Sequence, residues 1–179
     1  MLERKINLLC KFRNYVMKEQ IQGEDSKDIV VVERGEKGKI LIRIVYKTRL
    51  ASGAVGVESI RKMGKKMPAE GYEKGILIGE KFSVSARKEA VSRGIEEIPI
   101  SKIPAFNIFD HKLVPKHEIL IKEEADKLLR RYHVEPHQLP RIKACDPAVF
   151  LIGGKRGDIV RITRESPTAG VHVTYRYVV

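Results

Sequence analysis

The sequence predicts two small units, an α/β sandwich over residues 1–105 and a mixed α+β unit over residues 106–179. Three observations lead to this expectation. Short apolar strands alternate with helices in the first part, and a polar segment from Ser101 to Asp110 follows, with Pro104 inside it. The last part ends in two strands joined by a turn. A length of 179 residues is enough for one ordinary domain or two small ones.

The elements of the first unit follow from the spacing of its apolar residues. Apolar side chains recur at helical spacing from Leu2 to Ile21 and predict a first helix. The remaining expected elements are strands at 28–33 and 39–46 joined by a turn at 35–38, a helix through Val57, Ile60, Met63 and Met67, a strand at 75–78, a helix opened by Ser83 or Ser85 and ended by Gly94, and a strand at 95–100. The order α-β-β-α-β-α-β is typical of an α/β sandwich.

The elements of the second unit follow from residues that begin or end helices. Acidic residues favour the first turn of a helix, aspartate caps it, and proline or glycine ends it. The expected elements are a helix from Glu123 with the stripe Ala125, Leu128, Leu129 and Tyr132, an extended Gln138–Leu139 between Pro136 and Pro140, a helix from Asp146–Pro147 to Gly153–Gly154, and strands at 158–164 and 171–179 around a turn at 166–170. In the last strand, Val171, Val173, Tyr175 and Tyr177 face one side and His172, Thr174 and Arg176 the other.

The net charge of +12 is spread over both units, with +7 in residues 1–110 and +5 in residues 111–179. Such a surface suits a protein beside a polyanion, and it is also common in proteins from hot environments. The two cysteines, Cys10 and Cys145, lie far apart, which argues against a disulfide framework and a structural zinc site. No apolar run reaches the length of a membrane span, so a soluble intracellular protein with no membrane partner is expected.

A series of motifs in the second unit carries a resemblance to a known family. In order they are His111–His117 (HKLVPKH), Gln138–Ile142 (QLPRI), Asp146–Pro147, Gly153–Asp158 (GGKRGD), Arg164–Gly170 (RESPTAG) and Thr174–Arg176 (TYR). This segment resembles the small H-type subunit of archaeal RNA polymerase, the counterpart of the carboxyl-terminal domain of the eukaryotic fifth polymerase subunit. The resemblance implies a non-catalytic subunit of a multisubunit DNA-directed RNA polymerase, docked on the largest subunit with other polymerase subunits as partners. It also implies a cytoplasmic protein, or a nuclear one if the source is eukaryotic.

The interface with the polymerase is expected at motif residues that have no obvious role in the core. Arginine suits such an interface because its planar fork binds carboxylates and carbonyls with two hydrogen bonds. The candidates are Leu113, Val114, Pro115, His117, Gln138, Arg141, Arg164, Thr168 and Arg176.

The first unit resembles the Mrr-type nucleases of the restriction endonuclease superfamily, through VGVESIRKM and GYEKGILIGEKFSVSARKEAVSRGIEEIPI. That family needs an acid on one strand, then an acid or Gln, any residue and Lys on the next, to hold a metal and steady the phosphate. Asp28 or Asp25 supplies the first acid. The aligned triplet at 43–45 is Arg-Ile-Val, and a shift by two residues gives Val-Tyr-Lys, so neither register supplies the second ligand. A degenerate nuclease fold with no catalytic residue, no metal and no cofactor is therefore expected.

The eukaryotic fifth subunit is similar in plan, because a nuclease-like domain there projects as a jaw near downstream DNA. The resemblance thus implies that residues 1–105 form a jaw-like domain. Lys62, Lys65 and Lys66 lie on and beside one helical face and are expected to contact the phosphates of downstream duplex DNA. Two alternative functions stay open, a free nucleic-acid-binding adaptor and a metal-dependent nuclease of the restriction endonuclease superfamily.

Overall fold

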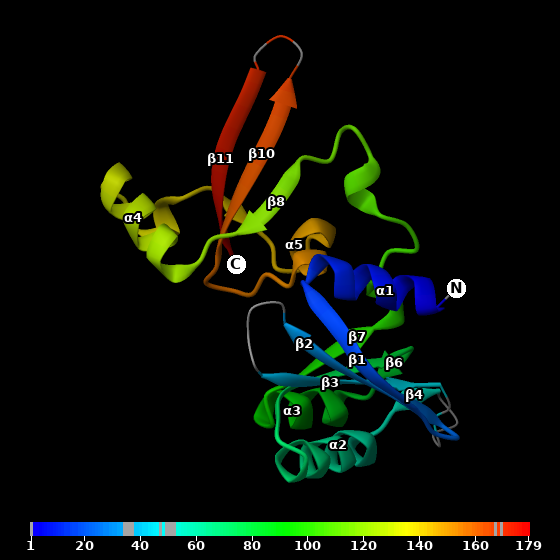
Figure 1. Cartoon of the computed structure of the whole chain (residues 1–179). Helices are drawn as coiled ribbons and strands as arrows, with labels where there is room; N and C mark the ends of the chain where they lie inside the picture. Colours follow the sequence, from blue (N-terminus) through cyan, green and yellow to red (C-terminus); the bar gives the residue numbers. More distant parts are fainter. Residues whose placement is uncertain (1, 34–37, 47, 49–52, 167, 169) are drawn as a thin grey trace. The chain divides into compact units, whose positions relative to one another are not determined.

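The computed structural model of the chain describes residues 2–33, 38–46, 48, 53–166, 168 and 170–179. The chain divides into two compact units, Met1–Ile103 and Pro104–Val179 (Figure 1). The division falls inside the polar segment expected between the units. Two short 3-10 helices lie in this part of the chain, η1 (Ile100–Lys102) and η2 (Ile108–Asp110).

A five-stranded mixed sheet forms the centre of the first unit, in the order β1 (Tyr15–Gln22), β2 (Ser26–Glu33), β3 (Lys39–Val45), β5 (Tyr72–Gly79) and β7 (Ile95–Pro99). β2 is antiparallel to both of its neighbours, β1 and β3, while β3, β5 and β7 are parallel. The helices α2 (Val57–Ala69) and α3 (Val84–Ser92) cover one face, and α1 (Leu2–Phe12) lies on the other side (Figure 1).

Both faces of the central strands carry branched apolar side chains, which is typical of a sheet covered on two sides. Successive side chains of a strand point to opposite faces, and Ile40, Leu41 and Ile42 of β3 are all buried. The cluster under α2 and α3 consists of Leu41, Val45, Val55, Ile60, Met63, Leu77, Phe82, Ala86, Ala90 and Ile95. This packing confirms the α/β sandwich predicted for the first unit.

The predicted helix from Leu2 to Ile21 is wrong in its second half. The helix α1 ends at Phe12, Asn14 takes the left-handed conformation with φ 55°, and β1 follows at once. Helical spacing of a few apolar residues did not reveal this change, because the backbone of β1 is satisfied by antiparallel pairing with β2. The first unit therefore begins with one helix followed by three strands.

The other elements of the first unit agree with prediction apart from their ends. Ser83, and not Ser85, caps α3, because its hydroxyl accepts the amide of Ala86 at 3.2 Å. A small parallel sheet of β4 (Ala54–Val55) and β6 (Lys81–Phe82) was not predicted. Most of the turn expected at 35–38 lies outside the described residues.

The second unit contains a four-stranded sheet in the order β8 (Lys116–Ile119), β10 (Ile159–Ser166), β11 (Gly170–Val178) and β9 (Arg141–Ile142). β10 is antiparallel to both of its neighbours, and β9 is parallel to β11. The helix α4 (Lys122–Tyr132) supplies Leu128 to a cluster with Leu120, Ile159, Tyr175 and Tyr177. The helix α5 (Pro147–Ile152) supplies Val149 to a cluster with Val160, Ile162 and Val178. The mixed α+β prediction is confirmed.

Two details of this unit differ from prediction. The helix α4 ends because His133 takes the left-handed conformation, three residues before Pro136. Gln138 is not extended, since it lies in the 3-10 helix η3 (Pro136–Gln138). The short strands β8 and β9 were not predicted, because two to four residues carry too little alternation to be recognised.

Candidate functional site

Asp28, the residue expected as the first acid of a nuclease site, lies on β2 opposite Arg43 of β3. The Arg43 guanidinium donates from Nε to Oδ1 and from Nη2 to Oδ2 of Asp28, each at 2.7 Å. Lys66 of α2 also reaches this carboxylate, with Nζ 2.8 Å from Oδ2. Asp28, Arg43 and Lys66 thus form a closed ionic cluster, called the Asp28 triad below.

The Asp28 triad is largely shielded from water, and the side chains of Asp28, Arg43 and Lys66 are 8%, 14% and 23% exposed. Burial opposes ionisation of Asp28, but the hydrogen bonds from Arg43 and Lys66 outweigh it and lower the pKa of the carboxyl below its usual value. The same hydrogen bonds to Asp28 raise the pKa of the Arg43 guanidinium. Asp28 and Arg43 therefore form an ionised pair at neutral pH.

The donor set of the triad does not suit a divalent cation, because one carboxylate is already neutralised by two cations. Arg43 lies where the resemblance to the nuclease family leads us to expect the second ligand, and its side chain is a cation. Within the described part of the chain, no group of three His, Cys, Asp or Glu side chains lies close enough together to hold a metal ion. Asp25, the alternative first acid, is exposed, and Lys47 of the shifted triplet lies outside the described residues.

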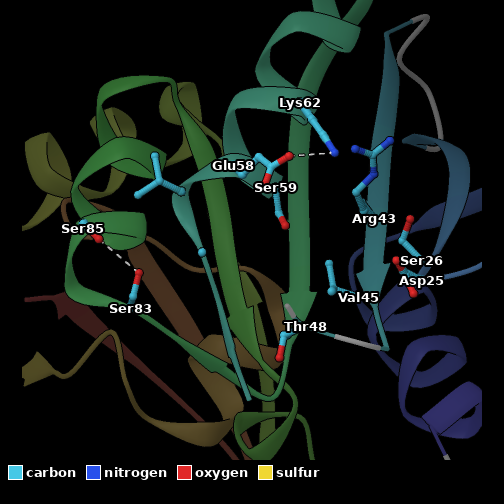
Figure 2. A pocket seen from close by; sticks show the side chains of 12 residues that line it. Asp25, Ser26, Arg43, Val45, Thr48, Glu58, Ser59, Lys62, Ser83 and Ser85 are labelled. Carbon is cyan, nitrogen blue, oxygen red and sulfur yellow. Dashed lines mark hydrogen bonds and ion pairs between the residues drawn. The ribbon is translucent and has the colours of Figure 1, made fainter. Parts of the chain in front are cut away.

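A pocket of about 460 Å³ opens beside the triad, because Arg43 belongs to both. Figure 2 shows Arg43 among the residues that line the pocket. Its lining comes from β2, β3, the start of α2 and the start of α3, and consists of Asp25, Ser26, Arg43, Val45, Thr48, Gly56, Val57, Glu58, Ser59, Lys62, Ser83 and Ser85. Glu58 lies 3.0 Å from the ammonium of Lys62, one helical turn away. The lining mixes both charges with several hydroxyls, so it offers hydrogen bonds to a polar molecule but no group of carboxylates around one point.

The three lysines expected to face DNA have different surroundings. Lys62 is 59% exposed and paired with Glu58. Lys65 is exposed, and no ion pair of its side chain is found among the described residues. Lys66 is turned inward to Asp28, and it also lies 3.7 Å from Glu70. Lys62 and Lys65 thus remain accessible on α2, while Lys66 is part of the triad.

In the second unit, four of the expected interface residues lie around one groove of about 340 Å³. Leu113, Val114 and Pro115 line it from one side and Arg164 from the end of β10. Leu113 is 79% exposed. The groove therefore combines an exposed apolar side chain with an arginine.

The other expected interface residues lie elsewhere in this unit. Arg176 of β11 donates to the backbone carbonyl of Arg141 at 3.3 Å, so both arginines lie at the β9 edge of the sheet. Gln138 accepts from the amide of Glu135 and is used in the cap of η3. His117 hydrogen-bonds through Nδ1 to the carbonyl of Pro115, and the Thr168 hydroxyl lies 3.3 Å from that of Ser166.

Sequence reasoning did not detect the contact between Lys66 and Asp28. The two residues are 38 positions apart, and only the packing of α2 against the sheet brings them together. It also missed that Val171 and Val173 stay exposed, since they lie on the same side of β11 as the partly buried Tyr175 and Tyr177. The helix α4 has 11 residues and the strand β11 has nine, and a helix rises less per residue than a strand. The helix is therefore too short to cover β11 and the rest of that sheet face, and these lengths were the signal that could have revealed the exposed valines.

Comparisons with known proteins divide the chain at nearly the same place as its structure. Residues 106–178 match the family model described as RNA polymerase Rpb5, C-terminal domain. Residues 1–103 match the family model described as restriction endonuclease. The family models thus account for both units separately.

Three curated relatives match the C-terminal part of the chain, over about two fifths of its length. DNA-directed RNA polymerase subunit Rpo5 of Thermococcus kodakarensis is 57% identical over 74 residues, which are 41% of this chain and 90% of the relative. The Pyrococcus abyssi subunit is 60% identical with the same coverage, and the Methanocaldococcus jannaschii subunit is 53% identical over 72 residues, 40% of this chain and 92% of the relative. The solved structure of EndoMS in apo form aligns with a TM-score of 0.40 and 10% identity, over 48% of this chain and 38% of that one. In the described part of the chain, every helix is too short or too polar to cross a membrane.

Proposed function

Because the chain belongs to the RNA polymerase Rpb5 C-terminal domain family through residues 106–178 and to the restriction endonuclease family through residues 1–103, we propose that it acts as a non-catalytic subunit of DNA-directed RNA polymerase. The observation that carries this proposal is an identity of 53–60% to subunits named Rpo5, over 90% or more of their own length. The second unit thus corresponds to nearly the full length of these relatives. The first unit is additional sequence, and its role is inferred from its own residues.

The second unit is the part that docks on the largest subunit and contacts other polymerase subunits. Support comes from exposed groups, namely the groove at Leu113 and Arg164 and the arginines at the β9 edge. No carboxylate partner of Arg141, Arg164 or Arg176 is found among the described residues. Interfaces are enriched in arginine, and a desolvated arginine needs acceptors that another chain has to supply.

Copurification from native extract tests this assembly. The tagged chain is expected to bring down the largest polymerase subunit, and the double variant Arg141→Ala with Arg164→Ala is expected to recover at least about tenfold less, since each arginine of an interface centre contributes on the order of 1–2 kcal/mol. The matched control is Arg131→Ala with Arg156→Ala, which removes the same charge from two other exposed positions. Thermal stability of both variants stays close to that of the parent chain. Full recovery of the Arg141 and Arg164 variant would remove these two residues from the interface.

The first unit is the jaw-like part and lies beside downstream duplex DNA in the polymerase. Support comes from the exposed Lys62 and Lys65 on one side of α2 and from the net positive charge of this half of the chain. The contacts are to phosphates, since these residues present no stacking surface for bases. Asp28, Arg43 and Lys66 contribute no catalysis, because the one carboxylate of the triad is already paired with two cations.

A salt titration of open complexes tests the jaw. In reconstituted polymerase, Lys62→Glu with Lys65→Glu is expected to lower the salt slope of complex stability by roughly 0.9 for each lysine–phosphate ion pair that the variant removes, without changing promoter choice. Lys66 is left unchanged so that the triad stays intact. Identical slopes would place this face of α2 in bulk solvent.

A chain that binds DNA alone but recovers no polymerase subunit would instead be a free adaptor, and Mg²⁺-dependent cleavage that disappears in Asp28→Asn would make it a nuclease.

A further inference from the structure

The sheet of the second unit has an incomplete edge at β11. The strand runs from Gly170 to Val178, but its outer neighbour β9 pairs only with Tyr177 and Val178. Among the described residues, no strand pairs with the outer side of residues 170–176. The greater part of a nine-residue strand therefore has a free edge.

Two hydrogen bonds determine which backbone groups face this edge. The amide of Tyr177 donates to the backbone carbonyl of Pro140 at 2.9 Å, on the outer side of β11. The amide of Val178 donates to the backbone carbonyl of Asp158 at 2.9 Å, on the side of β10. Backbone groups of an antiparallel strand alternate between its two sides. The N–H and C=O groups of Val171, Val173 and Tyr175 therefore point away from β10, while those of His172 and Thr174 bond to it.

The side chains beside this edge alternate as well. Val171 and Val173 lie on one face and are 67% and 40% exposed. On the other face the register pairs His172 with Arg164, and Arg176 follows four residues later. Natural proteins normally protect a free edge with charged or proline residues or with a bulge, and an exposed apolar edge is a template for another strand.

We propose that the free edge of β11 accepts an extended acidic segment of another polymerase subunit, which adds to this sheet as a strand. This rests on the proposed function. The segment carries apolar side chains on the face of Val171 and Val173 and carboxylates on the face of Arg164 and Arg176, because these arginines lack a carboxylate partner among the described residues. Main-chain hydrogen bonds supply affinity in this mode of recognition and the alternating side chains supply specificity. A second copy is the poorer occupant, since it would bring another net charge of +12 and the same arginines to the edge.

Hydrogen exchange in the assembled polymerase tests the edge directly. The full chain, labelled and reconstituted into polymerase, is exposed to deuterated water, then recovered and read by NMR. In the free chain the amides of Val171 and Val173 exchange fast and those of His172 and Thr174 slowly. In the polymerase the two valine amides are expected to slow at least about a hundredfold, as paired strand amides do. If the chain assembles and these amides remain fast, the inference is overturned while the proposed function stands.

A pair of variants separates the backbone from the side chain. Val173→Pro removes an outward N–H without breaking a bond to β10, and proline is tolerated on edge strands. Val173→Ala shortens the same side chain and keeps the N–H. Recovery with polymerase is expected to fall about tenfold for Val173→Pro and less than about threefold for Val173→Ala, in line with the removal of one or two main-chain hydrogen bonds. Equal recovery of the two variants would overturn the inference. If Val173→Pro does not fold, the exchange experiment on the parent chain decides instead.

A synthetic peptide in which Val and Glu alternate over eight positions tests the edge without any polymerase. It is expected to bind the full chain, to slow exchange at Val171 and Val173, and to weaken as salt is raised. A peptide with Lys in place of Glu is the matched control and is expected to bind at least about tenfold more weakly. Protection that depends only on the concentration of the chain itself would indicate a second copy and would overturn the inference. If the chain recovers no polymerase subunit, the proposed function fails, and the peptide still decides whether this edge accepts an acidic strand.

Discussion

At the scale of single residues, the Asp28 triad is the feature with the largest expected energetic effect. Asp28→Ala leaves Arg43 partly buried without the carboxylate that it binds and leaves Lys66 with Glu70 alone. The loss of one partner of a buried ion pair costs on the order of 3 kcal/mol. The free energy of unfolding of the first unit, measured with urea at pH 7, is expected to fall by about this amount. Asp25→Ala is the control, since Asp25 is exposed and its loss is expected to stay within about 0.5 kcal/mol.

The same residue predicts how stability depends on pH. The pKa of Asp28 is lowered in the folded chain from the usual value of 3.8. The contribution of Asp28 to the free energy of unfolding is therefore present in full above that value and is lost as the pH falls through the lower pKa of the folded chain. The difference in stability between the parent chain and Asp28→Ala is therefore expected to shrink only below about pH 4. A difference that instead shrinks between pH 6 and pH 8 would mean that another group controls it.

Arg43 is the residue that faces Asp28 from the neighbouring strand. Arg43→Glu puts a second carboxylate beside Asp28, and two facing carboxylates are a site for Mn²⁺ or Mg²⁺. At a Mn²⁺ concentration ten times the Kd, binding adds ~1.4 kcal/mol and raises the Tm of the first unit by about 5 °C. Arg43→Gln, which also loses the guanidinium but gains no carboxylate, is expected to show no such rise, and neither is the parent chain. An equal rise in Arg43→Gln would place the metal elsewhere.

At the scale of elements, the change from α1 to β1 depends on one residue, Asn14, whose φ is 55°. A left-handed conformation costs a residue with a Cβ roughly 1 kcal/mol, less for asparagine, and glycine adopts it freely. Asn14→Ala is therefore expected to lower the unfolding free energy by about 1 kcal/mol, and Asn14→Gly to leave it within about 0.5 kcal/mol. Urea unfolding of the two variants measures this. An alanine variant as stable as the glycine variant would show that the turn is not under this constraint.

At the scale of the whole molecule, the two units are expected to have separable roles. The second unit corresponds to nearly the whole of the Rpo5 relatives, which match 90% or more of their own length to it. A tagged fragment 104–179 is therefore expected to bring down the largest polymerase subunit, and a fragment 1–103 is not. A unit of this size is near the lower limit for an independent core, so its Tm is measured first. Recovery of the polymerase by fragment 1–103 alone would move the docking surface to the first unit.

The residues that were predicted correctly from the sequence are those whose structural effect is local. Asp146 caps α5 by accepting the amide of Ala148 at 2.9 Å, and Gly153 ends the helix with φ 84°. The alternation along β11 is confirmed, since Tyr175 and Tyr177 pack with Leu128. Caps, stops and alternation depend on neighbours within a few positions, so a single sequence contains them.

The sequence alone determined that residues 43–45 are Arg-Ile-Val and include neither an acid nor a lysine, because residue identities are known without a structure. Only the tertiary structure decided what surrounds Asp28, since Lys66 reaches it across 38 positions through the packing of α2 on the sheet. It also decided that residues 15–22 form a strand and that the edge of β11 is open. Strand pairing joins backbone groups far apart in the chain, and local side-chain spacing does not encode which partners they meet.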